Sequence, residues 1–198
     1  MLLLFLALCD KILLGEFETF LTYSKSEEKT KLKEKRMKKS NTLYLTRGAM
    51  VAALYVALTY LSHLFGLASG VIQFRLSEAL CILPVFMPEA TLGLFVGCLL
   101  SNLLTGCAVW DIIFGSLATL IGAVGAGLLR RLPHKLAFAA TLPTLTSNAF
   151  IVPFVLIYTY GAEGTYLYFM ITVGIGELVC ACGGGTALYY TIKRYSKK

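Results

Sequence analysis

The chain has 198 residues, of which 57% are hydrophobic and 15% are charged, and its mean hydropathy is +0.74. This composition excludes an ordinary soluble domain and indicates an integral membrane protein. The net charge of +7 does not indicate a nucleic-acid partner. The basic residues flank apolar runs, where they contact the headgroups of membrane lipid and set the orientation of the helices.

Residues 1–40 differ from the rest of the chain, because they hold nine of its 18 Lys and Arg residues and six of its 11 Asp and Glu residues. The segment MLLLFLALCDKILLG begins like a signal sequence, but it lacks a basic start and a small-residue cleavage site, and its apolar run is too short to span a bilayer. The charge run after it is typical of disorder. We therefore expect a disordered extension over residues 1–40, a membrane domain over residues 41–198, and Met37 as the natural initiator.

Six apolar runs, separated by Pro, Gly or charge, predict an all-α integral membrane protein with six transmembrane helices. The expected ranges are 49–67, 77–87, 88–104, 110–129, 136–160 and 166–192. The second run contains Pro84 and rises only about 16 Å at about 1.5 Å per residue. This second run could therefore be a short span, a tilted span or a re-entrant segment.

The placement of charge predicts the topology. With six spans, the basic residues at 38–47, 130–135 and 193–198 fall on one side of the membrane, and Arg75 alone falls on the other. Because cytoplasmic loops are enriched in Lys and Arg, this pattern places both termini in the cytoplasm. Five spans would put the basic C-terminus outside. We expect a multi-pass protein of a bacterial cell membrane.

Several polar side chains interrupt the apolar runs, and none of them falls in the inner third of the predicted bundle. They are Glu78, Asn102, Asp111, Asn148 and Glu177. An ionisable side chain near the bilayer centre costs about 2.5–3.5 kcal/mol, so it usually faces a partner or a wet cavity. We therefore predict one substrate cavity that opens to the outside, with Gln73 and Arg75 of the preceding loop at its rim.

Each of these assignments has a structural alternative. Glu177 and Asn148 could hydrogen-bond between helices without touching a ligand. Asp111 could cap its helix and complement the helix dipole. Trp110, which we include as a stacking platform for the substrate, could equally be an interfacial anchor. The sequence alone leaves these alternatives open.

Small residues form a stripe on the first helix, where Ala49, Ala53 and Ala57 recur every four residues. Residues at this spacing share one face of a helix, and small side chains allow another helix to approach closely. The stripe predicts either contact with a partner protein or packing within the bundle.

The sequence contains no motif for a bound cofactor, a metal or catalysis. GIGELV and CGGGT do not match a dinucleotide fingerprint, and a phosphate-binding loop and a zinc-protease motif are both missing. The cysteines mostly lie in apolar runs, where cysteine behaves as a small hydrophobic residue. We expect no cofactor, no metal and no enzyme activity, so any ATPase that drives transport must be a separate polypeptide.

Five segments together resemble the substrate-binding S components of energy-coupling-factor (ECF) transporters, in particular the queuosine-precursor group. They are VIQFRLSEALCILP, GLFVGCLLSNLLTG, WDIIFGSLATLIGA, SNAFIV and GIGELV. The resemblance covers residues 46–192, which is nearly the whole membrane part, and residues 1–37 have no counterpart in it. As a set these segments are fairly specific.

The resemblance implies a six-helix S component that captures a 7-deazaguanine such as 7-aminomethyl-7-deazaguanine, its 7-cyano analogue or queuine. It also implies docking on a transmembrane coupling protein and two cytosolic ATPase subunits, with Ala49, Ala53 and Ala57 matching the family's contact in the first helix. A deazaguanine offers N–H donors to a carboxylate, a carbonyl acceptor to Arg or Asn, and an aromatic face. We expect Glu177 or Glu78 at the guanine edge.

Three other functions compete with this interpretation. An S component for another vitamin is the nearest of them. A stand-alone secondary transporter would need a coupling-ion path through both halves of the membrane, and the inner halves of the predicted helices lack ionisable residues. A membrane enzyme that uses Glu78, Asp111 and Glu177 has no supporting catalytic spacing.

Overall fold

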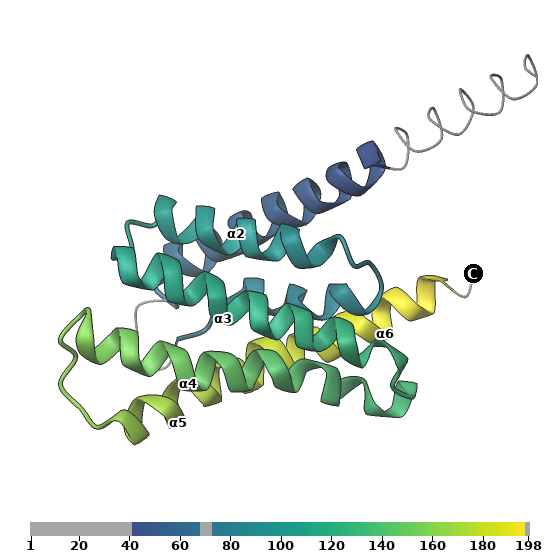
Figure 1. The fold of residues 1–198 in the computed structure, drawn as a ribbon. Helices are drawn as coiled ribbons and strands as arrows, with labels where there is room; N and C mark the ends of the chain where they lie inside the picture. The colour runs from purple at the N-terminus through teal and green to yellow at the C-terminus, as the bar shows by residue number, and fades with distance from the viewer. Residues whose placement is uncertain (1–40, 68–72, 197–198) are drawn as a thin grey trace, which may run out of the picture. The chain divides into compact units, whose positions relative to one another are not determined.

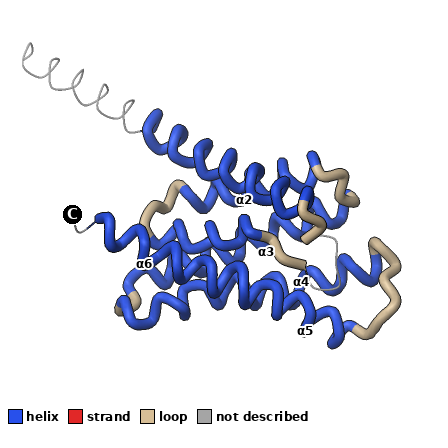
Figure 2. Tube along the Cα trace, turned by 180° about the vertical axis from the view of Figure 1, so that it is seen from behind, coloured by secondary structure: helices blue, strands red, loops and turns tan. Residues whose placement is uncertain are grey.

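The computed structural model describes residues 41–67 and 73–196, and every regular element in these ranges is helical. The prediction of an all-α protein is therefore confirmed for this part of the chain, as Figure 2 shows. By its internal contacts the chain divides into two units, Met1–Tyr44 and Leu45–Lys198. The second unit is the helical bundle. The expected disorder of residues 1–40 and the expected start at Met37 lie outside the described residues.

Within residues 41–67 and 73–196, four helices are long and apolar enough to cross a membrane. They are Asn41–Leu64, Val109–Arg131, Leu136–Tyr158 and Tyr166–Tyr195. Two further apolar helices, Leu76–Val85 and Ala90–Leu104, are shorter. The six elements follow one another in the order that the hydropathy pattern predicts, and the two short ones correspond to the predicted ranges 77–87 and 88–104.

Figure 1 labels the helices α2 to α6. After the first helix come η1 (Leu76–Val85), α2 (Ala90–Leu104), α3 (Val109–Leu128), η2 (Leu129–Arg131), η3 (His134–Thr141), α4 (Leu142–Tyr158), α5 (Tyr166–Glu177), η4 (Leu178–Gly184) and α6 (Gly185–Ser196). The expected range 136–160 is thus divided between η3 and α4, and the expected range 166–192 is divided among α5, η4 and α6.

The second element is wound as a 3-10 helix. Pro84, near its end, has no backbone N–H and disfavours α-helical geometry at the residue before it. A 3-10 helix rises about 2.0 Å per residue, so Leu76–Val85 spans about 20 Å rather than the shorter α-helical length. The element therefore reaches further through the bundle than an α-helix of ten residues would.

The last span contains a π-helical segment, η4, which begins directly after Glu177. Three consecutive glycines, Gly183 to Gly185, close this segment and open α6. Such wide turns often occur at functional sites, because they change which side chains share a face of the helix. Glu177 lies at the junction of the two windings.

Helix α3 packs against α2 and against α4, and α4 packs in turn against α5 (Figure 1). η1 lies inside the bundle in contact with α2, α3, η4 and α6. Its buried residues run from Ser77 to Pro84, with Ala79 only half-buried. Because η1 contacts so many elements, side chains along it reach the centre of the molecule.

The two ends of the bundle differ in their connections. The turns 105–108 and 159–165 lie at one end, and the turn 86–89 lies with η2 and η3 at the other, as Figure 1 shows. At this second end Arg47 of the first helix pairs with Glu89, with Nη1 and Oε1 3.1 Å apart. Glu89 is the residue that precedes α2.

The first helix approaches α2 so closely that only glycine fits at the contact. A Cβ atom on Gly93 would lie 2.4 Å from the carbonyl oxygen of Gly48, and one on Gly97 would lie 2.8 Å from the Cβ of Tyr55. Atoms at such distances would overlap, and the Gly48 oxygen belongs to the backbone. Gly93 and Gly97 therefore set the distance between the two helices.

We expect Gly93→Ala to lower the free energy of unfolding by about 1–3 kcal/mol, because the added methyl group forces two backbones apart. Gly127→Ala is the matched control in α3. Its Cβ would meet Pro84 at 3.6 Å, an ordinary contact, and alanine has the higher helix propensity. Thermal unfolding in detergent measures both variants. Equal unfolding temperatures for the two would contradict the predicted overlap.

Candidate functional site

Glu78 is the most deeply buried carboxylate of the described residues, with 1% of its surface exposed. Its Oε1 accepts hydrogen bonds from the Tyr55 hydroxyl and, at 3.5 Å, from Thr119 Oγ1. Its Oε2 accepts from Cys81 Sγ at 3.2 Å. The donors come from the first helix, α3 and η1. Both oxygens of Glu78 are thus already engaged by the protein.

Asn102 and Arg75 form a second part of the site. Arg75 Nη2 donates to Asn102 Oδ1 at 2.9 Å, and Asn102 is fully buried in α2. The Nε atom of Arg75 is also buried, but it has no hydrogen-bond partner among the described residues. A buried donor without an acceptor is costly, so Arg75 Nε is available to a ligand.

Asn148 and Glu177 form the third part. Asn148 Nδ2 donates to Glu177 Oε1 at 2.9 Å, and both side chains are buried, at 4% and 7% exposure. The second oxygen of Glu177, Oε2, is buried and has no partner among the described residues. Glu177 therefore keeps one acceptor free, whereas Glu78 does not.

A close backbone contact joins these parts. A Cβ atom on Gly176 would lie 2.1 Å from the carbonyl oxygen of Gln73, so the segment before η1 rests directly on α5. This contact places Arg75 near Glu177, and Arg75 and Glu78 are the charged groups that act electrostatically on Glu177. We name Arg75, Glu78, Asn102, Asn148 and Glu177 the polar cluster.

Four of the elements and the residue before η1 supply the polar cluster, which carries two carboxylates, one guanidinium and two amides. With all three charged groups ionised, its net charge is −1. The free groups are a carboxylate oxygen on Glu177 and a guanidinium N–H on Arg75. Such a pair can accept from one edge of a flat polar ligand and donate to another. The arrangement suits a planar heterocycle better than an apolar molecule.

Asp111 lies at the edge of this cluster. A Cβ atom on Gly115 would lie 3.1 Å from Asn102 Nδ2 and 3.4 Å from Asp111 Oδ1, so both polar side chains lie next to this glycine. Asp111 is in the first turn of α3, but the N-cap position belongs to Ala108. Of the two structural roles considered above, complementing the helix dipole fits this position, and N-capping does not.

Tyr160, in the turn between α4 and α5, is tied to Asp111. Its hydroxyl donates to Asp111 Oδ2 at 2.9 Å and accepts from the backbone N–H of Ala108 at 3.1 Å. Burial raises the pKa of Tyr160 to about 12, and the charge of Asp111 adds to the shift. The hydroxyl therefore remains a donor at neutral pH, and it fastens this turn to the start of α3.

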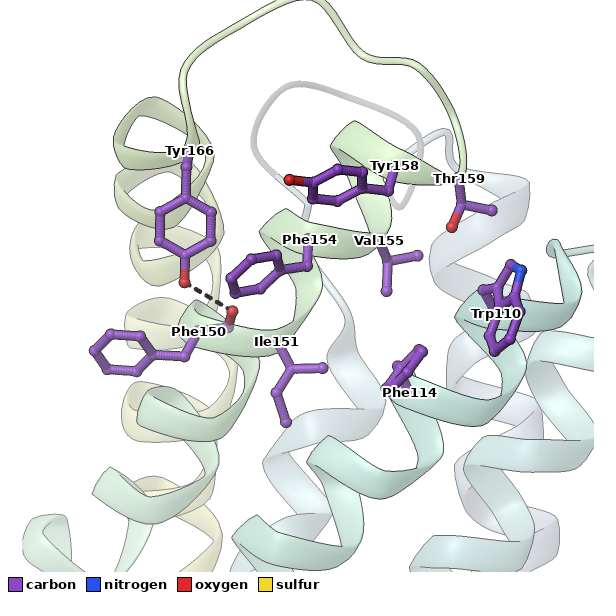
Figure 3. A pocket seen from close by; sticks show the side chains of 9 residues that line it. All are labelled: Trp110, Phe114, Phe150, Ile151, Phe154, Val155, Tyr158, Thr159 and Tyr166. Atoms are coloured by element: carbon purple, nitrogen blue, oxygen red, sulfur yellow. Dashed lines mark hydrogen bonds between the residues drawn. The ribbon is translucent and has the colours of Figure 1, made fainter.

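Trp110 does not join the polar cluster. It is 58% exposed and stacks on Phe114, with ring centroids 5.9 Å apart. It lines an apolar cavity of about 590 Å³, shown in Figure 3. The other lining residues are Phe114, Phe150, Ile151, Phe154, Val155, Tyr158, Thr159 and Tyr166. Since most of these aromatic side chains are exposed on the outside of the bundle, the cavity is a poor site for a polar ligand.

The sequence analysis missed the residues that hold the start of η1 in place. Thr59 Oγ1 donates to Ser77 Oγ at 2.8 Å, and Ser62 Oγ accepts from the backbone N–H of Leu76 at 3.1 Å. With Tyr55 they occupy positions i, i+4 and i+7, which is one face of a helix. A stripe of polar residues on one face of an otherwise apolar helix could have indicated these contacts from the sequence.

The alanine stripe faces away from the bundle. Ala49, Ala53 and Ala57 are all exposed, whereas Ala52 and Tyr55 face the core. The stripe therefore does not serve packing within the second unit. In the described ranges, no group of three or more His, Cys, Asp or Glu side chains is arranged to hold a metal ion.

We expect Tyr55→Phe to lower the free energy of unfolding by about 1–3 kcal/mol, because the buried Glu78 carboxylate loses a hydrogen-bond donor. Tyr60→Phe on the same helix is the control, since Tyr60 is 51% exposed. Unfolding of the two purified variants in detergent compares them. If Tyr55→Phe is as stable as Tyr60→Phe, the hydroxyl is not needed to bury Glu78.

Comparison with known proteins identifies the family. Residues 45–194 match the family model described as QueT transporter. A protein of Lactococcus lactis subsp. cremoris (strain MG1363), named "Queuosine precursor transporter QueT", is 42% identical over 85 residues, which is 43% of this chain and 50% of that protein. The alignment thus spans about half the length of this relative. No solved structure matches.

The match confirms the resemblance to the queuosine-precursor group, and the family is one of transporters rather than enzymes. It covers the first helix, the polar cluster and all the helices that follow, so the fold and the candidate site both lie within the matched region. This chain belongs to the QueT transporter family.

Proposed function

We propose that this chain is the substrate-capturing S component of an ECF importer, and that its cargo is a 7-deazaguanine precursor of queuosine. The observation that carries the proposal is that the polar cluster holds two buried atoms without a partner among the described residues, Oε2 of Glu177 and Nε of Arg75. Both atoms are buried, and a buried polar atom without a partner in a transporter is a natural contact for its substrate. The relative from Lactococcus lactis carries the name of a queuosine-precursor transporter.

Hydrogen-bond chemistry supports this cargo. The N1–H and exocyclic amine of a deazaguanine are adjacent donors, which a carboxylate accepts together. Glu177 is the better candidate for this edge, because the oxygens of Glu78 already accept from Tyr55, Thr119 and Cys81. Arg75 can donate to the ring carbonyl. Asn148 then holds Glu177 in position through its 2.9 Å hydrogen bond.

When Glu78, Glu177 and Arg75 are all ionised, the charge of the polar cluster favours the aminomethyl form of the cargo over the cyano form. The polar cluster has a net charge of −1 when its three charged groups are ionised, and Asp111 adds a further carboxylate at its edge. A ligand with one ammonium group would balance part of this charge, whereas a neutral nitrile would not. Buried charges are stabilised by partners of opposite sign.

We further propose six spans, with both termini in the cytoplasm of a bacterial cell membrane. Arg47, Arg130, Arg131 and the basic residues at the end of α6 belong to the end of the bundle opposite the turns 105–108 and 159–165. The 3-10 winding of η1 lengthens the doubtful second element to about 20 Å. These features favour the six-span topology that the charge pattern predicts.

In this proposal the exposed stripe of Ala49, Ala53 and Ala57 contacts a transmembrane coupling protein. Small exposed residues at i, i+4 spacing allow a partner helix to approach closely in a membrane. Two cytosolic ATPase subunits hydrolyse ATP, so the chain itself binds no cofactor. An S component for another vitamin is the second candidate, because it would share this stripe and differ only in the polar cluster.

We expect Glu177→Gln to weaken binding of 7-aminomethyl-7-deazaguanine about 10- to 100-fold, because a charged acceptor for two donors is lost. Isothermal titration calorimetry of the purified protein in detergent measures the affinity, with riboflavin, thiamine and biotin as competing cargoes. Glu163→Gln is the control, since Glu163 is an exposed carboxylate in the turn between α4 and α5. Tight binding of a vitamin in place of the deazaguanine would refute the cargo and leave the S component.

We expect Ala53→Phe to abolish uptake without changing affinity, because the larger side chain blocks the close approach of a partner helix. Uptake of labelled 7-aminomethyl-7-deazaguanine is measured in cells that also express a coupling protein and its ATPases. Ile175→Phe is the control at an exposed position of α5. Normal uptake by the Ala53→Phe variant would exclude the stripe as the contact.

A further inference from the structure

A second hollow follows the outer surface between α3 and α4, and it has a volume of about 470 Å³. Its apolar lining comes mainly from Ile121, Val124, Leu128, Pro143, Phe150 and Ile151. Phe150 and Ile151 also line the larger cavity of Figure 3, so the two hollows are neighbours. We name this second hollow the lower groove.

The lower groove offers no free hydrogen-bonding side chain. Its two polar residues are Thr146 and Ser147. Thr146 Oγ1 donates to backbone carbonyls one turn earlier in α4, at 3.0 and 3.1 Å, and Ser147 Oγ donates to the Ala118 carbonyl at 2.8 Å. Since both hydroxyls are engaged, the groove presents hydrocarbon to its occupant and suits an acyl chain better than a polar solute.

The floor of the groove results from close packing of a glycine on a proline. A Cβ atom on Gly125 would lie 2.4 Å from the Cβ of Pro143. This contact brings α3 and α4 together, while Val124 and Leu128 on either side of Gly125 remain 45% and 77% exposed. A depression between exposed apolar side chains results, with walls on both helices.

Two arginines lie at one end of the lower groove. Arg130 and Arg131 follow Leu128 within two and three residues, and both are exposed. Leu129–Arg131 is a 3-10 turn that follows α3 directly, and residues three apart are neighbours on a helix surface, so Arg131 lies near the face of Leu128. Among the described residues, neither arginine has an ion-pair partner.

We infer that the lower groove binds an anionic phospholipid, with one acyl chain between α3 and α4 and the phosphate at Arg130 and Arg131. The apolar lining fits the chain, and the two unpaired guanidinium groups fit the phosphate, which arginine binds through paired N–H donors. Basic residues at the cytoplasmic end of a groove between membrane helices bind anionic headgroups in the same way. The site is separate from the polar cluster and does not depend on the cargo.

A single-tryptophan protein tests this site. Trp110 is the one tryptophan of the sequence, so Trp110→Phe combined with Phe150→Trp places the only tryptophan where the lower groove meets the cavity of Figure 3. Trp110→Phe combined with Ile175→Trp is the matched probe on the exposed face of α5, outside the groove. Each protein is reconstituted in phosphatidylcholine nanodiscs that contain a small fraction of brominated phosphatidylglycerol, and tryptophan quenching reports the nearby lipid.

We expect the Phe150→Trp probe to be quenched as though brominated phosphatidylglycerol were enriched about tenfold over the bulk, since each arginine adds attraction for an anionic headgroup. The Ile175→Trp probe should report bulk composition. Arg130→Gln with Arg131→Gln should remove the enrichment. Lys193→Gln with Arg194→Gln, which removes the same number of charges from the end of α6, should retain it.

Three results would overturn the inference. One is equal quenching of the Phe150→Trp probe by brominated phosphatidylglycerol and by brominated phosphatidylcholine at the same fraction. Another is enrichment that survives loss of both arginines. The third is enrichment that also disappears in the Lys193→Gln, Arg194→Gln variant, which would show a general attraction of the basic end for anionic lipid. The first comparison needs no arginine variant, so it holds even if the double variant does not fold.

Discussion

The arrangement of the bundle depends on one constraint, which is that the carboxylate of Glu78 lies where water cannot reach it. An ionisable group in such a place must be surrounded by donors. Tyr55, Cys81 and Thr119 supply them from the first helix, η1 and α3. The first helix and α3 therefore have to meet around η1, and the position of η1 in turn determines where Arg75 lies.

Glycines make this meeting geometrically possible. The first helix reaches α2 over Gly93 and Gly97, α3 reaches α4 over Gly122 and Gly125, and each contact excludes a Cβ atom. In a membrane, where lipid is as apolar as leucine, close backbone packing replaces the hydrophobic effect as the main source of helix association. The glycines thus set the distances between the helices that surround the polar cluster.

Much of the fold could be predicted from the sequence, because hydropathy and charge report directly on membrane helices. The order of the six helical elements follows from the apolar runs. The windings of η1 and η4 could not be predicted, since both depend on tertiary contacts and on the local effects of Pro84 and the glycines after Cys182. Periodicity averages over a whole segment and does not resolve such local changes.

The candidate site was predictable in part for a similar reason. Charged residues such as Glu177 are easy to recognise in an apolar run. The rise per residue of a helix then predicts which of them lie at similar depths in the membrane. Which side chains form hydrogen bonds depends on how each helix is rotated about its axis, and the sequence does not specify this rotation. The Asn148–Glu177 and Arg75–Asn102 hydrogen bonds could therefore not be predicted. The sequence is compatible with two roles for Trp110, a stacking platform and an interfacial anchor. Only the structure shows that Trp110 lines the apolar cavity of Figure 3.

The contact between Gln73 and Gly176 has a consequence for how such a site evolves. Because the loop rests on the helix through the Gln73 carbonyl, which every amino acid possesses, its position is encoded by the partner helix rather than by the loop. Substitutions at Gln73 can change the chemistry of the rim while the chain path stays the same. Gly176 cannot vary in this way, since any side chain there would displace the segment that carries Arg75.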